Sequence, residues 1–278
     1  MKSLFTFLFA LLTVAAFSQK NFQGKAIYKS KTTMDMNFGG RQMSEDQKKR
    51  IAERMKGMLE KTYVLNFNKI ASTYKEEESL GAPGQGNGRF GGMMSSFSGG
   101  LRYKNIKEGI VLEEKEFFGK KFLISDTGTK PEWKLGSETK KIGNYICYKA
   151  ILTKKIDPTS FSSFRGRNQN NDTKKDSTQV VIPKEIQVIA WYTPQIPVSQ
   201  GPGEYWGLPG LILEINEGRS TVLCTEIILN PSEKVELKAP KKGKKVTRVA
   251  YNKIIKKKMD EMREQFRGRG NRNRGSRH

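Results

Sequence analysis

The stretch Leu211–Leu229, LILEINEGRSTVLCTEIIL, decides the fold class of this 278-residue chain. Its two halves, Leu211–Ile215 and Thr221–Leu229, are rich in Leu, Ile, Val and Thr, a composition typical of β-strands packed in a sheet. Between them lies Asn216-Glu217-Gly218-Arg219, a turn signal, because Asn and Gly accept positive φ angles. The stretch therefore predicts an antiparallel β-hairpin.

Similar short runs recur on both sides of this hairpin, separated by Gly, Pro and Asn turn signals. We predict strands in the segments 22–36, 63–67, 70–74, 101–105, 110–112, 121–124, 133–135, 142–152 and 186–192. Because helices do not alternate regularly with these strands, the pattern favours a mainly β (α+β) fold with an antiparallel sheet. By analogy with periplasmic lipoprotein carriers, we predict a strongly curved sheet, an open half-barrel.

Two amphipathic helices are predicted beside the sheet. Ser44–Gln47 forms a capping box, which starts a helix that extends to about residue 60. The second helix covers residues 249–266, where apolar side chains recur at helical spacing and Lys and Arg fill most other positions. Its apolar stripe consists of Ile255, Met259, Met262 and Phe266.

The N-terminus has the pattern of a secretory signal peptide. Lys2 precedes an apolar run, and Ala16-Phe17-Ser18 fits a small-x-small cleavage site, so residues 1–18 are predicted to be removed. We therefore expect an exported protein that is periplasmic, outer-membrane-associated or extracellular. Residues 19–248 are predicted to form one β-rich domain, with mobile insertions near the Gly-rich segment 79–100 and the polar segment 158–180.

The composition excludes several kinds of active site. His278, the last residue, is the single histidine, which excludes a Ser-His-Asp triad and an HExxH zinc site. Cys147 and Cys224 are the two cysteines, so a four-cysteine zinc or iron–sulfur site is excluded within one chain. We predict neither a metal site nor a cofactor. In an oxidising compartment the two cysteines could pair, or they could be small buried thiols, and the sequence leaves both readings open.

The most distinctive segment of the chain is Trp191–Leu213. At its centre Leu208-Pro209-Gly210-Leu211 predicts a type II turn, because Pro presets φ at the second position and Gly adopts a positive φ at the third. This turn would lead into the first strand of the hairpin.

Residues Gly207, Leu208, Pro209, Gly210, Leu211 and Ile212 spell the motif that names the GLPGLI family, and the chain resembles that family from about Phe22 to Leu229. Trp191–Pro194 and the earlier block Lys141–Ala150, with Trp133 before it, resemble the flanking parts of the family pattern. The resemblance implies a secreted protein of Gram-negative bacteria without an established activity. It supplies no catalytic residue.

Four aromatic residues of this segment, Trp191, Tyr192, Tyr205 and Trp206, are the candidate ligand-binding residues. In one reading, rigid turns present their faces to a ligand. In the other, they cover the end of the sheet. Because no catalytic constellation is visible, we favour a non-enzymatic envelope protein that binds an apolar or amphipathic ligand or an outer-membrane protein; an enzyme based on carboxylates is the alternative.

The C-terminus is strongly basic. Residues 234–278 contain 17 basic and 4 acidic residues, a net charge of +13 out of +23 for the chain. The last segment, 267–278, alternates Arg with Gly and Asn and is predicted to be a disordered tail. Such tails are similar to nucleic-acid-binding segments. In an exported protein, however, anionic lipid or lipopolysaccharide is the expected partner, and nucleic acid is not.

Overall fold

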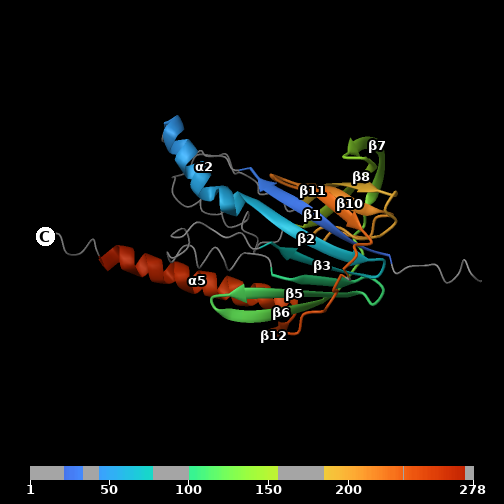
Figure 1. Cartoon of the computed structure of the whole chain (residues 1–278). Coiled ribbons are helices and arrows are strands. Elements are labelled where there is room, and N and C mark those ends of the chain that lie inside the picture. Colours follow the sequence, from blue (N-terminus) through green and yellow to red (C-terminus); the bar gives the residue numbers. More distant parts are fainter. Residues whose placement is uncertain (1–21, 34–43, 78–99, 156–184, 234, 273–278) are drawn as a thin grey trace, which may run out of the picture.

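The computed structural model describes residues 22–33, 44–77, 100–155, 185–233 and 235–272 (Figure 1). The predicted signal peptide and both predicted insertions lie almost wholly outside these residues. The elements are β1 (Gln23–Thr32), α2 (Glu45–Leu59), β2 (Glu60–Asn68), β3 (Ala71–Glu76), β4 (Arg102–Asn105), β5 (Ile110–Phe117), β6 (Lys120–Thr127), β7 (Lys134–Ile142), β8 (Tyr145–Lys155), β9 (Glu185–Thr193), β10 (Leu211–Glu217), β11 (Ser220–Leu229), β12 (Lys244–Val246) and α5 (Arg248–Arg272).

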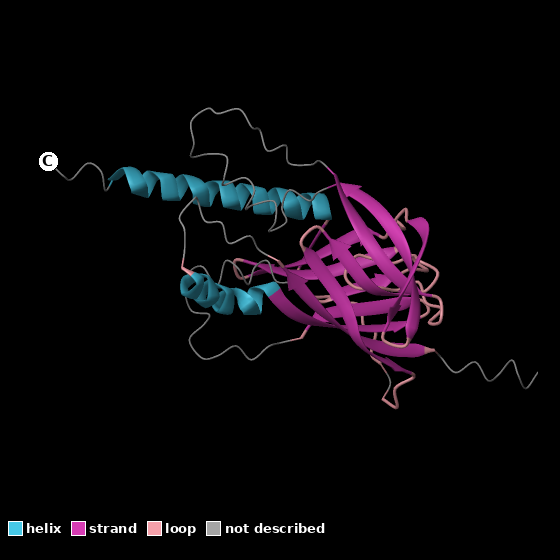
Figure 2. Cartoon of the chain, turned by 90° about the horizontal axis from the view of Figure 1, so that it is seen from above, coloured by secondary structure: helices cyan, strands magenta, loops and turns pink. Residues whose placement is uncertain are grey.

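The strands form one twelve-stranded sheet in the order β12-β6-β5-β4-β3-β2-β1-β11-β10-β9-β8-β7. Neighbouring strands are antiparallel except β12, which runs parallel to β6. The sheet is curved and open, and its edge strands β12 and β7 do not pair with each other (Figure 2). The predicted mainly β fold with a curved antiparallel sheet and two helices is therefore confirmed.

The hairpin quoted above is β10–β11. Glu217 pairs with Ser220 across Gly218-Arg219, and Gly218 has a φ of 57°, which a Cβ-free residue adopts without strain. The capping box of α2 is also present, since Ser44 and Gln47 bond to each other's backbone amides. Helix α5 continues to Arg272, six residues beyond the predicted end, so Arg267–Arg272 belong to the helix.

The core consists of three clusters of buried side chains. The first joins β1, β2, β8, β10 and β11, and the second lies on the opposite face of β8–β10. Cys147 belongs to the first and Ala150 to the second, and because side chains alternate along a strand, the two residues point to opposite faces. The third cluster packs Tyr251 and Ile255 of α5 on Phe117, Phe122 and Ile124.

Candidate functional site

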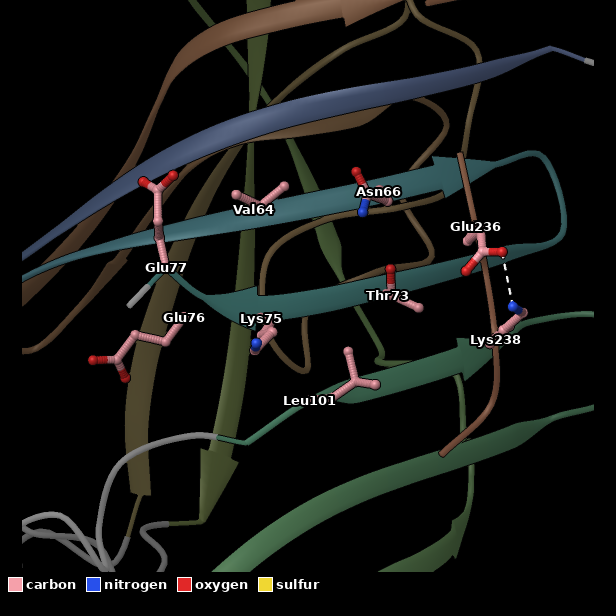
Figure 3. A pocket seen from close by; sticks show the side chains of 9 residues that line it. All are labelled: Val64, Asn66, Thr73, Lys75, Glu76, Glu77, Leu101, Glu236 and Lys238. Atoms are coloured by element: carbon pink, nitrogen blue, oxygen red, sulfur yellow. Dashed lines mark hydrogen bonds and ion pairs between the residues drawn. The ribbon is translucent and has the colours of Figure 1, made fainter. Parts of the chain in front are cut away.

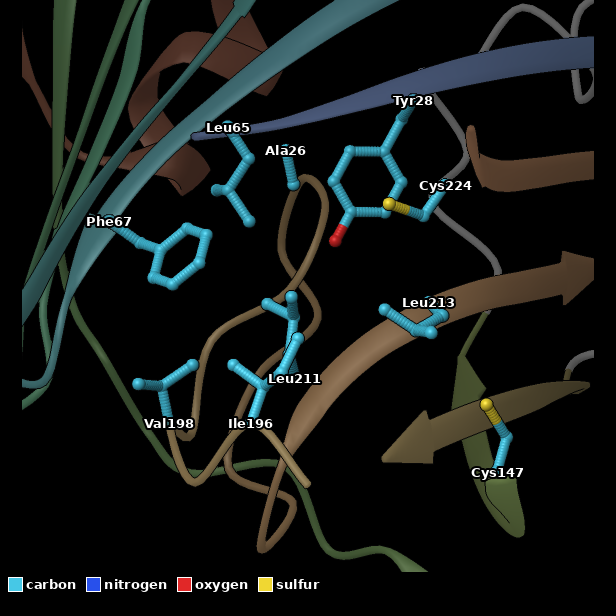
Figure 4. Close-up of a cluster of buried hydrophobic side chains, with 10 residues drawn as sticks. All are labelled: Ala26, Tyr28, Leu65, Phe67, Cys147, Ile196, Val198, Leu211, Leu213 and Cys224. Carbon is cyan, nitrogen blue, oxygen red and sulfur yellow. The ribbon is translucent and has the colours of Figure 1, made fainter. Parts of the chain in front are cut away.

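The connection 194–210, which joins β9 to β10, packs against both faces of the sheet. Ile196 and Val198 enter the first core cluster, where Figure 4 shows them near Leu65 and Phe67 of β2. Leu208 enters the second cluster. The connection also folds back on the strand that it precedes, through hydrogen bonds such as Leu211 N to Ile196 O at 3.0 Å. It is a buried part of the core and has no regular secondary structure.

The predicted type II turn at Leu208–Leu211 is wrong. Positive φ angles occur at Gly203 and Gly207, at 58° and 90°, and not at Gly210. Gly210 is needed for another reason: a Cβ there would lie 2.2 Å from the carbonyl oxygen of Thr193. The sequence pattern indicated a conformational role for Gly210, whereas the structure gives it a role in close backbone packing.

The four candidate aromatic residues do not form one surface. Tyr192, Tyr205 and Trp206 are buried, with 6%, 7% and 8% of their surface exposed. Trp191 packs on the first core cluster, with the Lys140 ammonium 4.5 Å from its ring centre, whereas Tyr192 and Tyr205 belong to the second. Ligand binding by these residues stays a prediction, and their burial favours the reading in which they cover the sheet.

A buried lysine holds the connection to the sheet. Lys104 of β4 is 1% exposed, and its ammonium nitrogen donates to the carbonyl oxygens of Gly201 at 2.8 Å and Tyr205 at 3.2 Å. Burial and the nearby Arg102 lower the pKa of Lys104 to about 7, although Glu204 opposes the shift. An amine with such a pKa suits nucleophilic chemistry, but this one is closed off from solvent and bonded to backbone.

Beside Lys104, a second lysine joins two carboxylates and a phenol. The Lys154 ammonium lies 2.6 Å from Glu204 Oε1, 2.7 Å from Glu217 Oε1 and 2.9 Å from the Tyr205 hydroxyl, which donates to Glu217 at 2.6 Å. Partial burial favours the neutral acid, but Arg102 and Lys154 hold the pKa of Glu204 below its usual value. Burial and the two carboxylates raise the pKa of Tyr205 well above its usual value. The cluster therefore contains an ionised Glu204 carboxylate and a neutral phenol.

A third charged cluster fixes the start of α5. Glu113 of β5 is 3% exposed; it accepts a hydrogen bond from Arg102 at 2.9 Å and pairs with Arg248 and Lys115. Burial alone would raise the pKa of Glu113, but the three cations hold it well below its usual range. Arg248 also donates from its backbone amide to Asp126 Oδ1 at 3.0 Å. These pairs attach the first turn of α5 to β5 and β6.

Sequence reasoning missed all three clusters. Lys104 and Gly201 are 97 positions apart, and Glu113 and Arg248 are 135 apart, so no local pattern connects them. Each charged residue looks like an ordinary solvated side chain in the sequence. The one signal that could have found them is the alternation within Arg102–Asn105, which places Arg102 and Lys104 on the same face of a strand.

A hollow of about 660 Å³ lies on the face of β2 and β3 opposite the core (Figure 3). The segment 235–243 crosses above these strands on its way to β12, and Glu236 and Lys238 form an ion pair there at 2.8 Å. The lining mixes both charges with few apolar side chains: Val64, Asn66, Thr73, Lys75, Glu76, Glu77, Leu101, Glu236 and Lys238. It holds no aromatic residue and does not suit an apolar ligand.

Cys147 and Cys224 are both buried and are free thiols in the structure. Burial raises the pKa of Cys147 to about 11 and that of Cys224 to about 12, which keeps both thiols protonated and unreactive at neutral pH. Across the described residues, no three His, Cys, Asp or Glu side chains are grouped to hold a metal ion. No helix in the described part of the chain has the length and apolarity to cross a membrane.

Residues 133–214 match the sequence profile of a family described as "Protein of unknown function (Porph_ging)". The matched stretch includes Trp133, β7–β9 and the connection 194–210, together with the Gly207–Ile212 motif. This match does not confirm the GLPGLI name, which stays a resemblance. The profile brings no activity that could be transferred to this chain.

Two solved structures of PNGF-II, in space groups C2 and P21, are similar to this chain with TM-scores of 0.47 and 0.46 at 15% and 16% identity. Each comparison covers 84% of this chain, but the chain spans only about a third, 32% and 33%, of PNGF-II. No curated protein matches the chain. Likeness at this level gives no function, so the function must be argued from the residues themselves.

Proposed function

We propose that this chain is an exported, non-enzymatic protein of the cell envelope that binds anionic amphipathic molecules, anionic lipid or lipopolysaccharide, through α5. One observation carries the proposal: α5 is fixed to the sheet at its first turns and presents a row of exposed lysines beyond them. The N-terminal sequence, with its signal-peptide pattern, supports export.

The attachment of α5 uses few residues. Tyr251 and Ile255 are 3% and 4% exposed against the third core cluster, with Ile254 and Met259 partly buried beside them. Figures 1 and 2 show the rest of the helix extending away from the sheet, at the end from which α2 also projects. The helix is thus held in a defined direction while most of its length is available for contact.

The charge of α5 fits an anionic surface. The helix has nine basic and three acidic residues, a net charge of +6. Lys253, Lys256 and Lys257 are exposed and form no ion pair among the described residues, whereas Lys258 pairs with Glu261 at 3.1 Å. Each Lys or Arg near an anionic membrane contributes about 1 kcal/mol, and the attraction falls off over a Debye length of about 8 Å at physiological salt.

The test is cosedimentation of the purified protein with vesicles of phosphatidylcholine, with and without phosphatidylglycerol, in a series of rising salt. We expect binding to the anionic vesicles that weakens as salt rises, and weak binding to neutral vesicles. Reversing Lys253, Lys256 and Lys257 to Glu should weaken binding about tenfold or more. The matched control reverses Lys107, Lys120 and Lys121, which are also exposed but lie away from α5's lysine row, in the turn before β5 and at the start of β6.

If the control lowers binding as much as the α5 variant, net charge and not α5 determines attraction, and the proposal is wrong. Binding that neither salt nor the α5 variant changes would also contradict it. Repeating the experiment with lipopolysaccharide in place of the vesicles shows whether the protein binds anionic lipid or lipopolysaccharide more tightly.

A carboxylate-based enzyme is the second candidate, and one observation favours it. Glu204 and Glu217 both contact the Lys154 ammonium, so two carboxylates lie close together beside the Tyr205 hydroxyl. Paired carboxylates serve glycoside hydrolysis, but one of them must act as an acid. Hydrolysis of nitrophenyl glycosides by the protein, abolished in Glu204→Gln and in Glu217→Gln without loss of the folded state, would establish this candidate instead.

A further inference from the structure

Strand β7 is an open edge of the sheet. It pairs with β8 on one side, and no strand among the described residues pairs with its other side. Figure 1 shows β7 at the margin of the molecule, away from α5. The backbone amides and carbonyls along this side can therefore pair with a further strand.

One face of the β7–β8 hairpin carries exposed apolar side chains. Leu135, Ile146 and Tyr148 are 62%, 53% and 39% exposed. In the register of the two strands, Leu135 lies opposite Ala150, Thr139 opposite Tyr148, and Lys141 opposite Ile146, with a bulge in β7 between Leu135 and Thr139. Residues directly opposite each other share a face, so the three apolar side chains lie on one surface with Thr139 and Lys141, next to the open edge.

The charge of β7 restricts what can pair with it. The strand contains Lys134, Lys140 and Lys141 but only one acid, Glu138. Lys140 is bound to Glu214, and Glu138 is bound to Lys149, both at 2.7 Å. Lys134 and Lys141 are exposed and form no ion pair among the described residues. Two lysines free of carboxylate partners therefore lie at the ends of the strand.

A second copy of β7 is a poor partner for this edge. In an antiparallel pair of two β7 strands, six lysines would meet two acids, and registers that place Lys134 opposite Lys140 or Lys141 bring like charges together. Lysines on an edge strand deter pairing between basic strands in this way. They do not deter an acidic strand.

We propose that β7 binds an extended segment of another protein, with alternating acidic and apolar residues, as an added strand of the sheet. Backbone hydrogen bonds to the open edge would provide the affinity. The apolar residues of the segment would cover Leu135 and Tyr148, and its acids, on the opposite face, would pair with Lys134. This interaction is independent of α5 and of anionic lipid.

The probe is a synthetic peptide of alternating Glu and Val, titrated to millimolar concentration into the purified, isotope-labelled protein and followed by NMR. We expect shifts of the amide signals of β7 and binding about tenfold tighter than that of the corresponding Lys-Val peptide. Methylating alternate backbone nitrogens of the Glu-Val peptide, in both possible phases, should abolish binding in one phase, because an added strand bonds through every second amide.

Two variants test the residues. Lys134→Glu should weaken binding of the Glu-Val peptide at least about fivefold, while Lys107→Glu, the same change in an exposed turn, should leave it unchanged. Ile146→Glu should weaken it as well. Because these side chains are exposed, thermal unfolding of the variants should be unaltered, which separates loss of binding from loss of fold.

The absence of β7 shifts at millimolar peptide overturns the proposal. Binding that survives methylation in both phases overturns strand addition too, because it would then rest on charge alone. A concentration-dependent dimer that Lys134→Glu alters would show that a second copy of the chain, and not an acidic segment, occupies the edge.

Discussion

The connection 194–210 and the helix α5 reverse the usual relation between regular structure and burial. The connection has no helix or strand, yet Ile196, Gln200 and Leu208 are at most 1% exposed. Helix α5 is regular over 25 residues, yet among its side chains that the structure describes only Tyr251 and Ile255 are buried. Anchoring side chains, and not backbone regularity, decide which of the two regions is part of the core.

The anchors differ in kind as well. The connection is held by polar groups on its backbone and side chains: Lys104 binds two of its carbonyl oxygens, and Ser72 donates to Gln200 at 2.8 Å. The first turn of α5 is held by ion pairs around Glu113 and by apolar contact. A chain without helical or strand hydrogen bonds must satisfy its buried amides and carbonyls in other ways, and the connection does so through the sheet.

The largest effect is expected in the connection. Gly210→Ala would place a Cβ 2.2 Å from the Thr193 carbonyl oxygen, so the backbone of either β9 or the connection must move. We expect a loss of about 3 kcal/mol or more in the free energy of unfolding. Urea denaturation measures it. Gly207→Ala, where φ is 90° but the neighbour is the flexible side chain of Lys130, should cost less, about 1 to 2 kcal/mol.

If the two glycine variants lose equal stability, close packing is not what Gly210 provides. A Gly210→Ala protein as stable as the parent would mean that β9 and the connection separate easily. In that case the connection 194–210 would be no more tightly packed than the far part of α5.

The next effect is expected at the base of α5. Ile255→Ala removes a side chain that is 4% exposed and should cost about 2 to 3 kcal/mol, because the cavity lies against Phe122 and Ile124. Met262→Ala, two turns further along, should cost less than about 1 kcal/mol, since that side chain is only half-buried. Thermal unfolding of both variants measures the difference. Equal losses would show that the far part of α5 is also packed.

The sequence predicted most of the sheet and missed how its interior is filled. Apolar runs locate all the strands β1–β11, and the turn at Gly218-Arg219 predicts the β10–β11 hairpin. Strands β5 and β7, however, continue five and seven residues beyond the predicted segments 110–112 and 133–135, through stretches that are mostly polar. β12 was missed because three residues, Lys244–Val246, are too few to show a period. It exists because α5 and the segment before it bring the chain alongside β6.

The candidate site shows where such reasoning stops. Pro and Gly in the connection predict bends and surface loops, so its aromatic residues looked available to a ligand. Burial of Tyr205 depends on β8 and β10, and on Lys104 far away in the sequence, and no local pattern contains that information. Gly210 was correctly singled out, but from the sequence alone a positive φ and a close contact cannot be distinguished.

A smaller, pH-dependent effect is expected at Lys104. Burial lowers its pKa to about 7 in the folded protein, whereas an unfolded lysine titrates near 10.4, so the unfolded state binds more protons between these values. Stability linked to this group therefore rises with pH through that window. Between pH 6.5 and 8.5 we expect the parent to gain about 1 to 2 kcal/mol relative to Lys104→Met.

Denaturation of both proteins at the two pH values measures this gain. Subtracting the free energy of unfolding of Lys104→Met from that of the parent at each pH removes the contribution of the titrating groups that the two proteins share. A difference that does not change with pH would mean that Lys104 stays charged in the core. Lys154→Met is the comparison, because Glu204 and Glu217 raise the pKa of Lys154 against its partial burial, and no gain is expected over this range.

The smallest effect on stability is expected at the end of α5. Deleting residues 267–278 removes five arginines and no apolar side chain. Among the described side chains of α5, Met259 is the last that packs against the third core cluster, and the deletion starts eight residues beyond it. We expect the free energy of unfolding to change by less than about 0.5 kcal/mol. Cosedimentation with anionic vesicles should nevertheless weaken, because each arginine near the surface contributes about 1 kcal/mol. A loss of stability above about 1 kcal/mol would show that this segment packs on the domain. Unchanged vesicle binding would assign the attraction to Lys253, Lys256 and Lys257 alone.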